Sequence, residues 1–500
     1  MYLSYAPLWH TDLWGHVAYG HWMLDYGRLP AFDPFVELAD VTPLIASAWM
    51  SQVLFGAVER GGGAEWLSCV FAVVSVINYA TLGLVFFRQT SRLSLALVGS
   101  ILTWLICWDR HLVLRPELVG SVLFAMLLVL LSAVRLPGFN SDIRQTLSSE
   151  TSAIRLWSIR GLMGLVFVIW ANAHGAFVVG LILLTTIAIG AVCRAWRRGC
   201  SFLATIRDPE TKETLVLCLV AAGATLLNPY GIVLWLHVIS FGSNPNLSTI
   251  SEWQPPELTS MTALGGLLSS TVFVATLKFR RHNPTSTEWG LLTLFTAAVC
   301  LRERMVTWYA PVVVLLVMPG IHGLLDRIST TTLMMRMQSM ASQRSRVQTA
   351  LMILLVWLAF IFSPLSQPVL GGRLRTEKQL YRDQTPIGIT KFLRETTPTV
   401  RIANPQWWGD WLLWDGPPGL RVMLTTNTIH LLPAVHSEQL HAINWAKPGL
   451  ADRLNHYDVE LVVVDTARQV DLAAYIRLSP DWRIAYEDTQ GLVASRTREH

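Results

Sequence analysis

Long apolar runs occupy the chain between residues 66 and 363, and more hydrophilic segments flank them on both sides. A membrane-spanning helix needs about 20 apolar residues, with about 17 as a practical minimum. The candidate runs are 66–87, 93–108, 118–135, 161–193, 214–228, 261–278, 289–301, 305–325 and 348–363. The run 161–193 is too long for one span and is broken at residues 172–175, so it predicts two helices. The pattern therefore predicts about ten spans, several of them marginal in length.

Composition supports the same class of protein. Hydrophobic residues make up 52% of the chain and charged residues 15%, whereas soluble proteins carry roughly 25% charged residues. A chain with so little charge cannot cover a soluble surface, and a polytopic α-helical membrane protein is the class that remains. The net charge of +5 does not indicate a nucleic-acid partner, because basic residues of membrane proteins concentrate in cytoplasmic loops.

The basic residues predict which way the spans point. Eighteen Lys and Arg fall in the loops 88–92, 135–160, 194–213, 278–288 and 326–347. The intervening loops 109–117, 172–175, 229–260 and 302–304 hold four. The positive-inside rule places the first set in the cytoplasm. Both hydrophilic ends, 1–65 and 364–500, are then expected outside it.

Export of the segment 1–65 needs a signal, and its first residues lack a basic region followed by an apolar one. We therefore expect one further span upstream of Met1. The alternative is that the span at 66–87 inserts and carries a short N-terminus across the membrane.

The tail has the pattern of a small soluble α/β domain. Helical spacing at 386–395 and 472–478 alternates with an apolar strand at 459–465. A terminal hairpin is expected from 482–486 and 491–495. The six cysteines form no CxxC pair and predict neither a zinc site nor a disulfide framework. The chain thus divides into a first extracytoplasmic loop (1–65), a transmembrane helical domain (66–363) and a soluble extracytoplasmic domain (364–500).

Polar residues gather at the predicted outer ends of the spans. They are Asp12, His16, Asp33, Arg110, Arg115, Glu117, Asn172, His174, Glu252, Arg302 and Arg304. Ionisable groups at a membrane edge are costly and usually functional. Since nearly every outer segment contributes one, the pattern predicts a single outward-facing polar cavity.

Each of these groups also has a purely structural interpretation. Asp12 and His16 share a helix face and would suit a solvated interfacial pair. Asp33, which precedes a proline, is typical of a turn. Asn172 would satisfy the backbone at a helix break, and Arg302 and Arg304 would anchor in lipid headgroups.

The functional interpretation is transfer of a group from a lipid phosphate. A carboxylate at the outer surface can act as general base on an acceptor hydroxyl, and arginines can hold a phosphate bidentately. Positions i and i+2 lie about 200° apart on a helix, so on a regular helix only one of Arg302 and Arg304 would face the donor. On a loop or unwound turn both could converge. Arg304 and Arg115 are therefore predicted to hold the phosphate, with Arg302 in the headgroup region.

Several motifs carry a resemblance to a known family. They are Asp12-x-Trp14-x-His16, Asp33-Pro34-Phe35, Arg115-Pro116, the segment 170–175, Asn228-Pro229-Tyr230-Gly231, Glu252-Trp253 and the segment 409–414. Together they resemble bacterial multi-pass proteins of the GT-C glycosyltransferase type, many of them uncharacterised. The resemblance spans nearly the whole chain.

The resemblance implies a polyprenyl-phosphate-linked sugar as donor, a bacterial inner-membrane location and an outer C-terminal domain. It places the catalytic carboxylate at Asp12, with Asp33 second and His16 as orienting partner. Asn172, His174 and Glu252 are further candidates for substrate binding. No cofactor is expected, and nothing in the sequence supports a divalent metal.

Three positions depart from the family pattern. Gly15 stands where a second aromatic is frequent. Residues 47–49 read Ser-Ala-Trp rather than His-Glu-Trp, and 425–427 read Thr-Thr-Asn where relatives often carry Asp-Gly-Arg. These departures weaken the case for a bound metal and for a site in the tail.

Two classes of function remain at this stage. One is a membrane glycosyltransferase whose acceptor the sequence does not identify. The other is a non-enzymatic protein, either a transporter or an envelope-assembly factor with a partner-binding outer domain. Transporters commonly show inverted repeats and charged groups near the midplane, and this sequence shows neither, which favours the enzyme.

Overall fold

The structure is a computed structural model. It describes residues 5–40, 42–108, 110–134, 153–329, 353–354, 356–358, 360–361, 363–364, 366 and 373–497. The expected span at 348–363 lies largely outside these residues.

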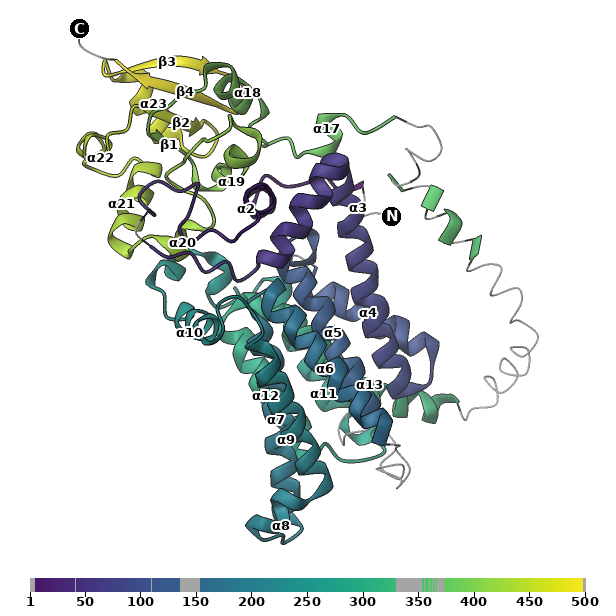
Figure 1. Ribbon diagram of the computed structural model, residues 1–500. Coiled ribbons are helices and arrows are strands. Elements are labelled where there is room, and N and C mark those ends of the chain that lie inside the picture. Colours follow the sequence, from purple (N-terminus) through teal and green to yellow (C-terminus); the bar gives the residue numbers. More distant parts are fainter. Residues whose placement is uncertain are drawn as a thin grey trace.

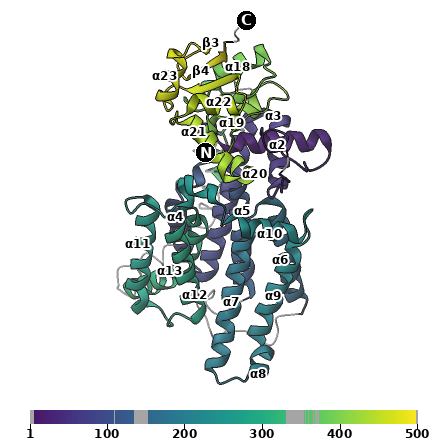
Figure 2. The same ribbon diagram turned by 90° about the vertical axis from the view of Figure 1, so that its left-hand side faces the viewer.

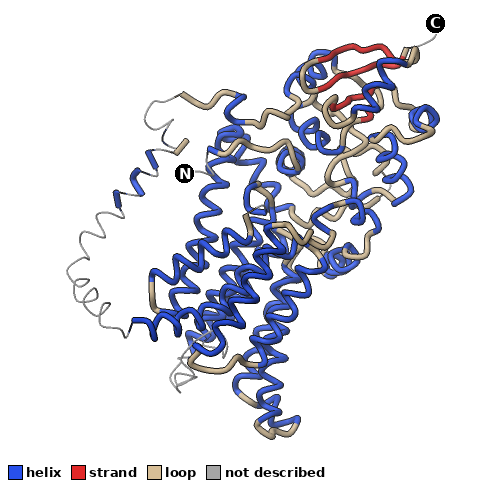
Figure 3. Tube along the Cα trace, turned by 180° about the vertical axis from the view of Figure 1, so that it is seen from behind, coloured by secondary structure: helices blue, strands red, loops and turns tan. Residues whose placement is uncertain are grey.

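Up to residue 329 the regular elements of the described chain are helices, and helices predominate in the molecule (Figure 3). The α-helices are α2 (Asp12–Tyr26), α3 (Trp49–Thr90), α4 (Leu93–Ile106), α5 (Pro116–Val134), α6 (Ala153–Ala173), α7 (Phe177–Arg197), α8 (Phe202–Arg207), α9 (Pro209–Thr225), α10 (Ile232–Phe241), α11 (Met261–Thr276), α12 (Ser286–Leu301) and α13 (Val306–Ser329). Short 3₁₀ turns are η1 (Arg110–Leu112), η3 (Pro245–Thr249), η4 (Ser251–Trp253), η5 (Leu277–Phe279) and η6 (Glu303–Met305).

Six of the helices in the described chain are long and apolar enough to cross a membrane. They are Trp49–Thr90, Pro116–Val134, Ile154–Ala173, Phe177–Arg197, Met261–Phe279 and Glu303–Ile328. The shorter apolar helices α4 and α12 coincide with two more of the expected spans, and α9 with a third. The break expected at 172–175 separates α6 from α7. The prediction of a polytopic helical membrane protein is confirmed.

Helix α3 begins earlier than the apolar run at 66–87 suggested. Its first part, from Trp49, contains Gln52, Glu59 and Arg60, which lower the hydropathy. A kink at Gly63, where φ is 70°, separates this part from the apolar remainder. The polar residues of this early part pair with α2, Glu59 with His21 and Arg60 with Asp25, so a hydropathy criterion does not detect it.

The bundle packs around α5 and α13, the two most buried spans. Large side chains fill the space between them, since Phe124, Trp170 and Trp308 lie in one buried cluster with ring centroids 5.4–6.1 Å apart. Burying such rings is strongly favourable, and it fixes the helix ends that carry the polar groups.

The C-terminal part forms a small α/β domain beside one end of the bundle, with α8 at the opposite end (Figure 1). Its elements are α17 (Glu377–Leu380), α18 (Ile387–Thr396), β1 (Ile402–Ala403), α19 (Gln406–Asp415), α20 (Thr428–Leu431), α21 (Ala434–Asn444), α22 (Leu450–His456), β2 (Leu461–Asp465), α23 (Val470–Leu478), β3 (Trp482–Glu487) and β4 (Gly491–Arg496). The sheet order is β1-β2-β4-β3, with β1 parallel to β2 and the remaining pairs antiparallel. The terminal hairpin expected from the sequence is β3–β4.

The segment before α3 belongs structurally to this domain. Helix α2 lies crosswise to the long helices (Figure 2) and packs against α19. Val36 forms a parallel bridge with Val422, and Trp14 packs against Trp411 with centroids 5.2 Å apart. The segment before α3 and the C-terminal domain therefore together cover one end of the bundle.

Candidate functional site

A cavity of about 650 Å³ lies where α2, the outer ends of the bundle helices and the C-terminal domain meet. Charged side chains from five separate segments line it: Asp12, Arg115, Glu252, Arg304 and Asp410. The cavity therefore exists only because distant parts of the sequence converge here.

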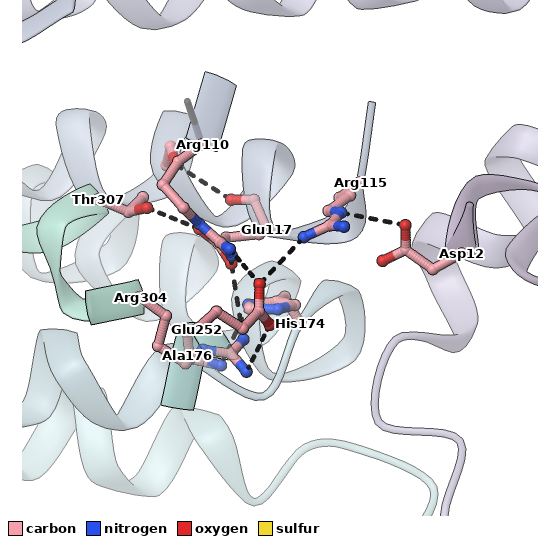
Figure 4. A network of polar contacts seen from close by, with 10 residues as sticks. Asp12, Arg110, Arg115, Glu117, His174, Ala176, Glu252, Arg304 and Thr307 are labelled. Atoms are coloured by element: carbon pink, nitrogen blue, oxygen red, sulfur yellow. Dashed lines mark hydrogen bonds and ion pairs between the residues drawn. The ribbon is translucent and has the colours of Figure 1, made fainter. Parts of the chain in front are cut away.

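A network of ion pairs runs along the wall that the bundle contributes (Figure 4). Arg115 Nε lies 3.0 Å from Asp12 Oδ1, and its Nη1 lies 3.3 Å from Glu252 Oε2. Arg110 pairs with the same Glu252 oxygen, and its Nη2 lies 2.6 Å from Glu117 Oε2. Arg304 closes the network with contacts of 3.5 Å to both glutamates. Three arginines and three carboxylates thus balance one another.

Glu252 is the centre of this network because all three arginines contact it. Burial alone would raise the pKa of Glu252, but Arg110, Arg304 and Arg115 outweigh burial and hold that pKa below its usual range. The carboxylate is therefore ionised at neutral pH and holds the arginines in place.

Local backbone structure positions the network. Pro116 begins α5 and places Glu117 in its first turn, where the helix dipole favours a negative charge. Glu117 Oε1 accepts a hydrogen bond of 2.6 Å from the Thr307 hydroxyl at the start of α13. The two most buried spans are thereby joined at the edge of the cavity.

Arg302 and Arg304, which follow α12, have different environments. Arg302 is extended, with φ −147° and ψ 113°, and a 3₁₀ turn follows. Its Nη1 donates to the Trp253 carbonyl at 2.8 Å, and it does not line the cavity. Arg304 does line the cavity and lies over the Trp253 ring, 4.3 Å from the centroid. Arg304 and not Arg302 therefore lines the cavity, although the segment is an extended residue followed by a 3₁₀ turn and not a regular helix. Phosphate binding by Arg304 stays a prediction.

Six residues named from the sequence line the cavity together: Asp12, His16, Arg115, His174, Glu252 and Arg304. His16 Nδ1 lies 3.1 Å from Gln52 Nε2, and His174 Nδ1 accepts from the Ala176 amide at 3.3 Å. Their catalytic and binding roles stay predictions, but the sequence placed them correctly on one surface.

Two further candidates do not line the cavity and have structural contacts instead. Asn172 donates to the carbonyls of Val168 and Leu227 at 2.8 and 2.9 Å, and it accepts from Trp49. Asp33 accepts from the amides of Phe35 and Val36, the geometry of a turn, and is bonded to the Tyr19 hydroxyl. Both placements favour the structural interpretation.

Sequence reasoning gave no role to several residues that the structure brings to the site. Arg110 and Glu117 appeared only among the outer polar groups. His237 of α10 and His430 of α20 line the far wall, where the His430 ring stacks on Phe241 with centroids 4.2 Å apart. Burial, together with the nearby His237, Arg304 and His16, lowers the pKa of His430 to about 3, so it is neutral.

Of the charged side chains that line the cavity, Asp410 lies furthest along the chain. It belongs to α19, is almost fully buried and lies in the segment 409–414, one of the motifs that carry the family resemblance. That motif and the unusual glycine at position 15 drew attention to this region, but neither assigned a role to Asp410. Among the described residues, no group of three or more His, Cys, Asp or Glu side chains is arranged to hold a metal ion.

Comparisons with known proteins give similarity in structure and none in sequence. No protein-family model matches the chain, and no protein of curated function matches it. The structure is similar to the oligosaccharyltransferase AglB from Archaeoglobus fulgidus, solved with an inhibitory peptide and a dolichol-phosphate. That match has a TM-score of 0.60 at 12% identity and covers 98% of this chain and 70% of AglB.

Two other solved structures were also found. The A. fulgidus enzyme tethered to an acceptor peptide matches with a TM-score of 0.56 at 13% identity, covering 97% of this chain and 70% of that chain. ArnT from Cupriavidus metallidurans, solved with undecaprenyl phosphate, gives a TM-score of 0.48 at 14% identity, covering 99% and 95%.

The class follows from the fold. The chain is a polytopic membrane protein, a helical bundle with a C-terminal domain over one end, and its fold resembles that of the GT-C type. The resemblance to the archaeal oligosaccharyltransferase covers 98% of this chain and 70% of that enzyme.

Proposed function

We propose that this protein is an integral membrane glycosyltransferase that transfers a sugar from a polyprenyl-phosphate donor to an acceptor outside the cytoplasm. The observation that carries the proposal is one cavity at the edge of the bundle, in which the Asp12 carboxylate pairs with Arg115 and Arg304 lines the same space. The fold supports it, since a similar structure is that of an oligosaccharyltransferase solved with a dolichol-phosphate.

The proposed reaction uses these three groups in distinct ways. The acceptor oxygen forms a bond to C1 of the sugar, and the bond from C1 to the phosphate oxygen breaks. Asp12 takes the acceptor proton as general base, and the electron pair of the broken bond stays on the phosphate. Arg115 and Arg304 stabilise that added negative charge through charge-assisted hydrogen bonds.

The donor phosphate can bind because Arg115 exchanges one of its carboxylate partners for the phosphate. Arg115 is held by both Asp12 and Glu252, so a phosphate that binds Arg115 replaces one carboxylate contact. Loss of the contact to Asp12 frees this carboxylate for the acceptor proton. Glu252 still holds Arg110 and Arg304 in place.

The distribution of basic residues supports one orientation. We place the cavity and the C-terminal domain on the non-cytoplasmic face of a bacterial plasma membrane, because the basic loops lie at the other end of the spans. The donor's lipid tail then lies in the bilayer while its phosphate reaches the arginines.

The test uses the full chain in lipid nanodiscs with a synthetic radiolabelled undecaprenyl-phosphate hexose, and water as acceptor. We expect release of free hexose and of undecaprenyl phosphate. Absence of release, combined with movement of the labelled lipid between leaflets of a proteoliposome, would contradict the enzyme and support the transporter.

A further inference from the structure

Asp410 reaches the cavity through a gap in α2. A Cβ added at Gly15 would overlap Asp410 Oδ1 and would lie 3.0 Å from its Cγ. Gly15 is on α2 between Asp12 and His16, two of the cavity-lining residues. A carboxyl of the C-terminal domain therefore occupies the space that a side chain at position 15 would fill.

The environment of this carboxyl differs from that of Asp12. Asp12 is paired with Arg115, whereas in the described part of the chain no arginine or lysine forms an ion pair with Asp410. Its oxygens accept hydrogen bonds from Thr426, from the amide at 3.0 Å and from the hydroxyl at 3.1 Å. These neutral donors hold the carboxyl at the cavity wall without supplying a charge.

The groups that face Asp410 favour its neutral form. Asp12, His16 and Tyr19 face it from α2, and the segment 425–427 contributes only uncharged side chains. Burial and the negative charge of Asp12 raise the pKa of Asp410 to about 7, although the Thr426 hydrogen bonds act in the opposite direction. When two carboxyls share a cavity but their environments push their pKa values apart, one frequently acts as an acid and the other as a base.

We propose that Asp410 is a second active-site residue, a proton-bearing carboxyl that enters through the gap at Gly15 and donates its O–H to a substrate oxygen beside Asp12. This inference rests on the proposed function, because the oxygen belongs to the donor or acceptor of that reaction. The neutral carboxyl supplies a hydrogen-bond donor, whereas an ionised one would repel both Asp12 and the donor phosphate.

The first test needs no ligand. Thermal unfolding of the full chain in nanodiscs is compared between wild type and Asp410→Asn from pH 5 to pH 8.5. The native carboxyl binds its proton more tightly than the unfolded chain, whose pKa is about 3.9. Wild type should therefore lose stability as pH rises through about 7, and Asp410→Asn should escape that loss. A constant difference between the two proteins across this range would overturn the neutral form.

The second test measures hexose release from the undecaprenyl-phosphate hexose as a function of pH. Wild type should lose activity above about pH 7, and Asp410→Asn should remain active without this decline. Its amide oxygen can accept from the Thr426 N–H, while its NH2 donates one hydrogen to the Thr426 hydroxyl oxygen and the other to the substrate. Below about pH 7, Asp410→Ala should be slower than wild type by roughly 10- to 100-fold, the usual effect of a lost hydrogen bond to a charged group.

Glycine variants separate the carboxyl's position from its chemistry. Gly15→Ala should reproduce the Asp410→Ala rate, because the new methyl group displaces the carboxyl. Gly223→Ala in α9, where a Cβ meets nothing within 4 Å, is the matched control and should be silent.

The outcomes also separate this inference from the proposed function. Release by wild type with an unchanged alkaline decline in Asp410→Asn, or full activity in Asp410→Ala, overturns the role of Asp410 and leaves the enzyme intact. No release by any protein contradicts the function, while the unfolding experiment still decides the protonation state.

Discussion

The two ends of the helical bundle carry their charges in different ways. At the cavity end, Glu252 alone contacts three arginines from three segments. At the other end, the most buried ion pairs each join one arginine to one glutamate: Arg160–Glu213, Arg194–Glu210 and Arg280–Glu288. One carboxylate there is also shared, since Asp326 contacts both Arg92 and Arg281, but Arg281 is more than half exposed. The Arg194 guanidinium forms several hydrogen bonds, and those that it donates to a carboxylate in the described chain go to Glu210.

This difference indicates where a charged ligand can bind. A buried one-to-one pair loses its compensation when one partner leaves, which is strongly destabilising. In a shared network each charge keeps another partner when one contact is exchanged, so a phosphate can enter at little electrostatic loss. The pairs thus serve the fold, and the network is suited to a substrate.

The largest effect is expected at Asp12. Asp12→Asn keeps the shape but removes the proton acceptor, and a general base contributes roughly 10²–10⁴-fold. Turnover per folded molecule in the hexose-release assay should fall by that factor. The control is Glu210→Gln at the other end of the bundle, which should leave turnover unchanged. Near wild-type turnover in Asp12→Asn would remove Asp12 as the base.

The next effect is on stability at the opposite end. Both side chains of the Arg280–Glu288 pair are almost fully buried, so Arg280→Met leaves an uncompensated carboxylate at a cost of about 3–5 kcal/mol in the free energy of unfolding. Arg198→Met breaks a pair whose arginine is half exposed, and should change stability by less than about 1 kcal/mol. Equal losses in denaturant unfolding would show that burial does not distinguish these pairs.

Donor binding provides a smaller and more specific effect. Arg304→Ala and Arg115→Ala should each weaken binding of undecaprenyl phosphate by roughly 1.5–3 kcal/mol, the value of a hydrogen bond to a charged group. Arg302→Ala is the neighbouring control and should change little, because Arg302 bonds to the Trp253 carbonyl outside the cavity. Binding that is insensitive to both Arg304 and Arg115 would place the phosphate elsewhere.

Orientation can be tested without any substrate. An export-dependent reporter should be active when fused after residue 500 and inactive when fused at residue 200, because the basic loops alternate as the positive-inside rule requires. The reverse pattern would put the cavity in the cytoplasm and exclude the proposed acceptor side.

Much of the fold was predictable because hydropathy reports directly on lipid burial. The span at Pro116–Val134 and the break between α6 and α7 follow from it. It does not detect the first part of α3, where polar residues face another part of the protein instead of lipid. It also passes over α10, which is only 10 residues long yet forms part of the cavity wall.

The site was predictable to the extent that membrane-edge charge is rare. Asp12, Arg115 and Arg304 stand out for that reason, and the structure brings them to one cavity. Asp410 lies in the motif at 409–414, but its place in the site was not predictable, because a charged residue is ordinary in a soluble domain and only tertiary packing carries it to α2. Asp33 was ambiguous from the sequence, since a turn and a catalytic loop can have the same local sequence; the structure shows the turn contacts.

The most direct test of the account is the position of the bound phosphate. A cryo-electron microscopy structure of the full chain in nanodiscs with undecaprenyl phosphate should show the phosphate within hydrogen-bond distance of Arg115 and Arg304, with the Arg115–Asp12 contact opened. Phosphate bound at the opposite end of the bundle, or a cavity whose ion pairs remain intact around an absent phosphate at saturating lipid, would contradict the account.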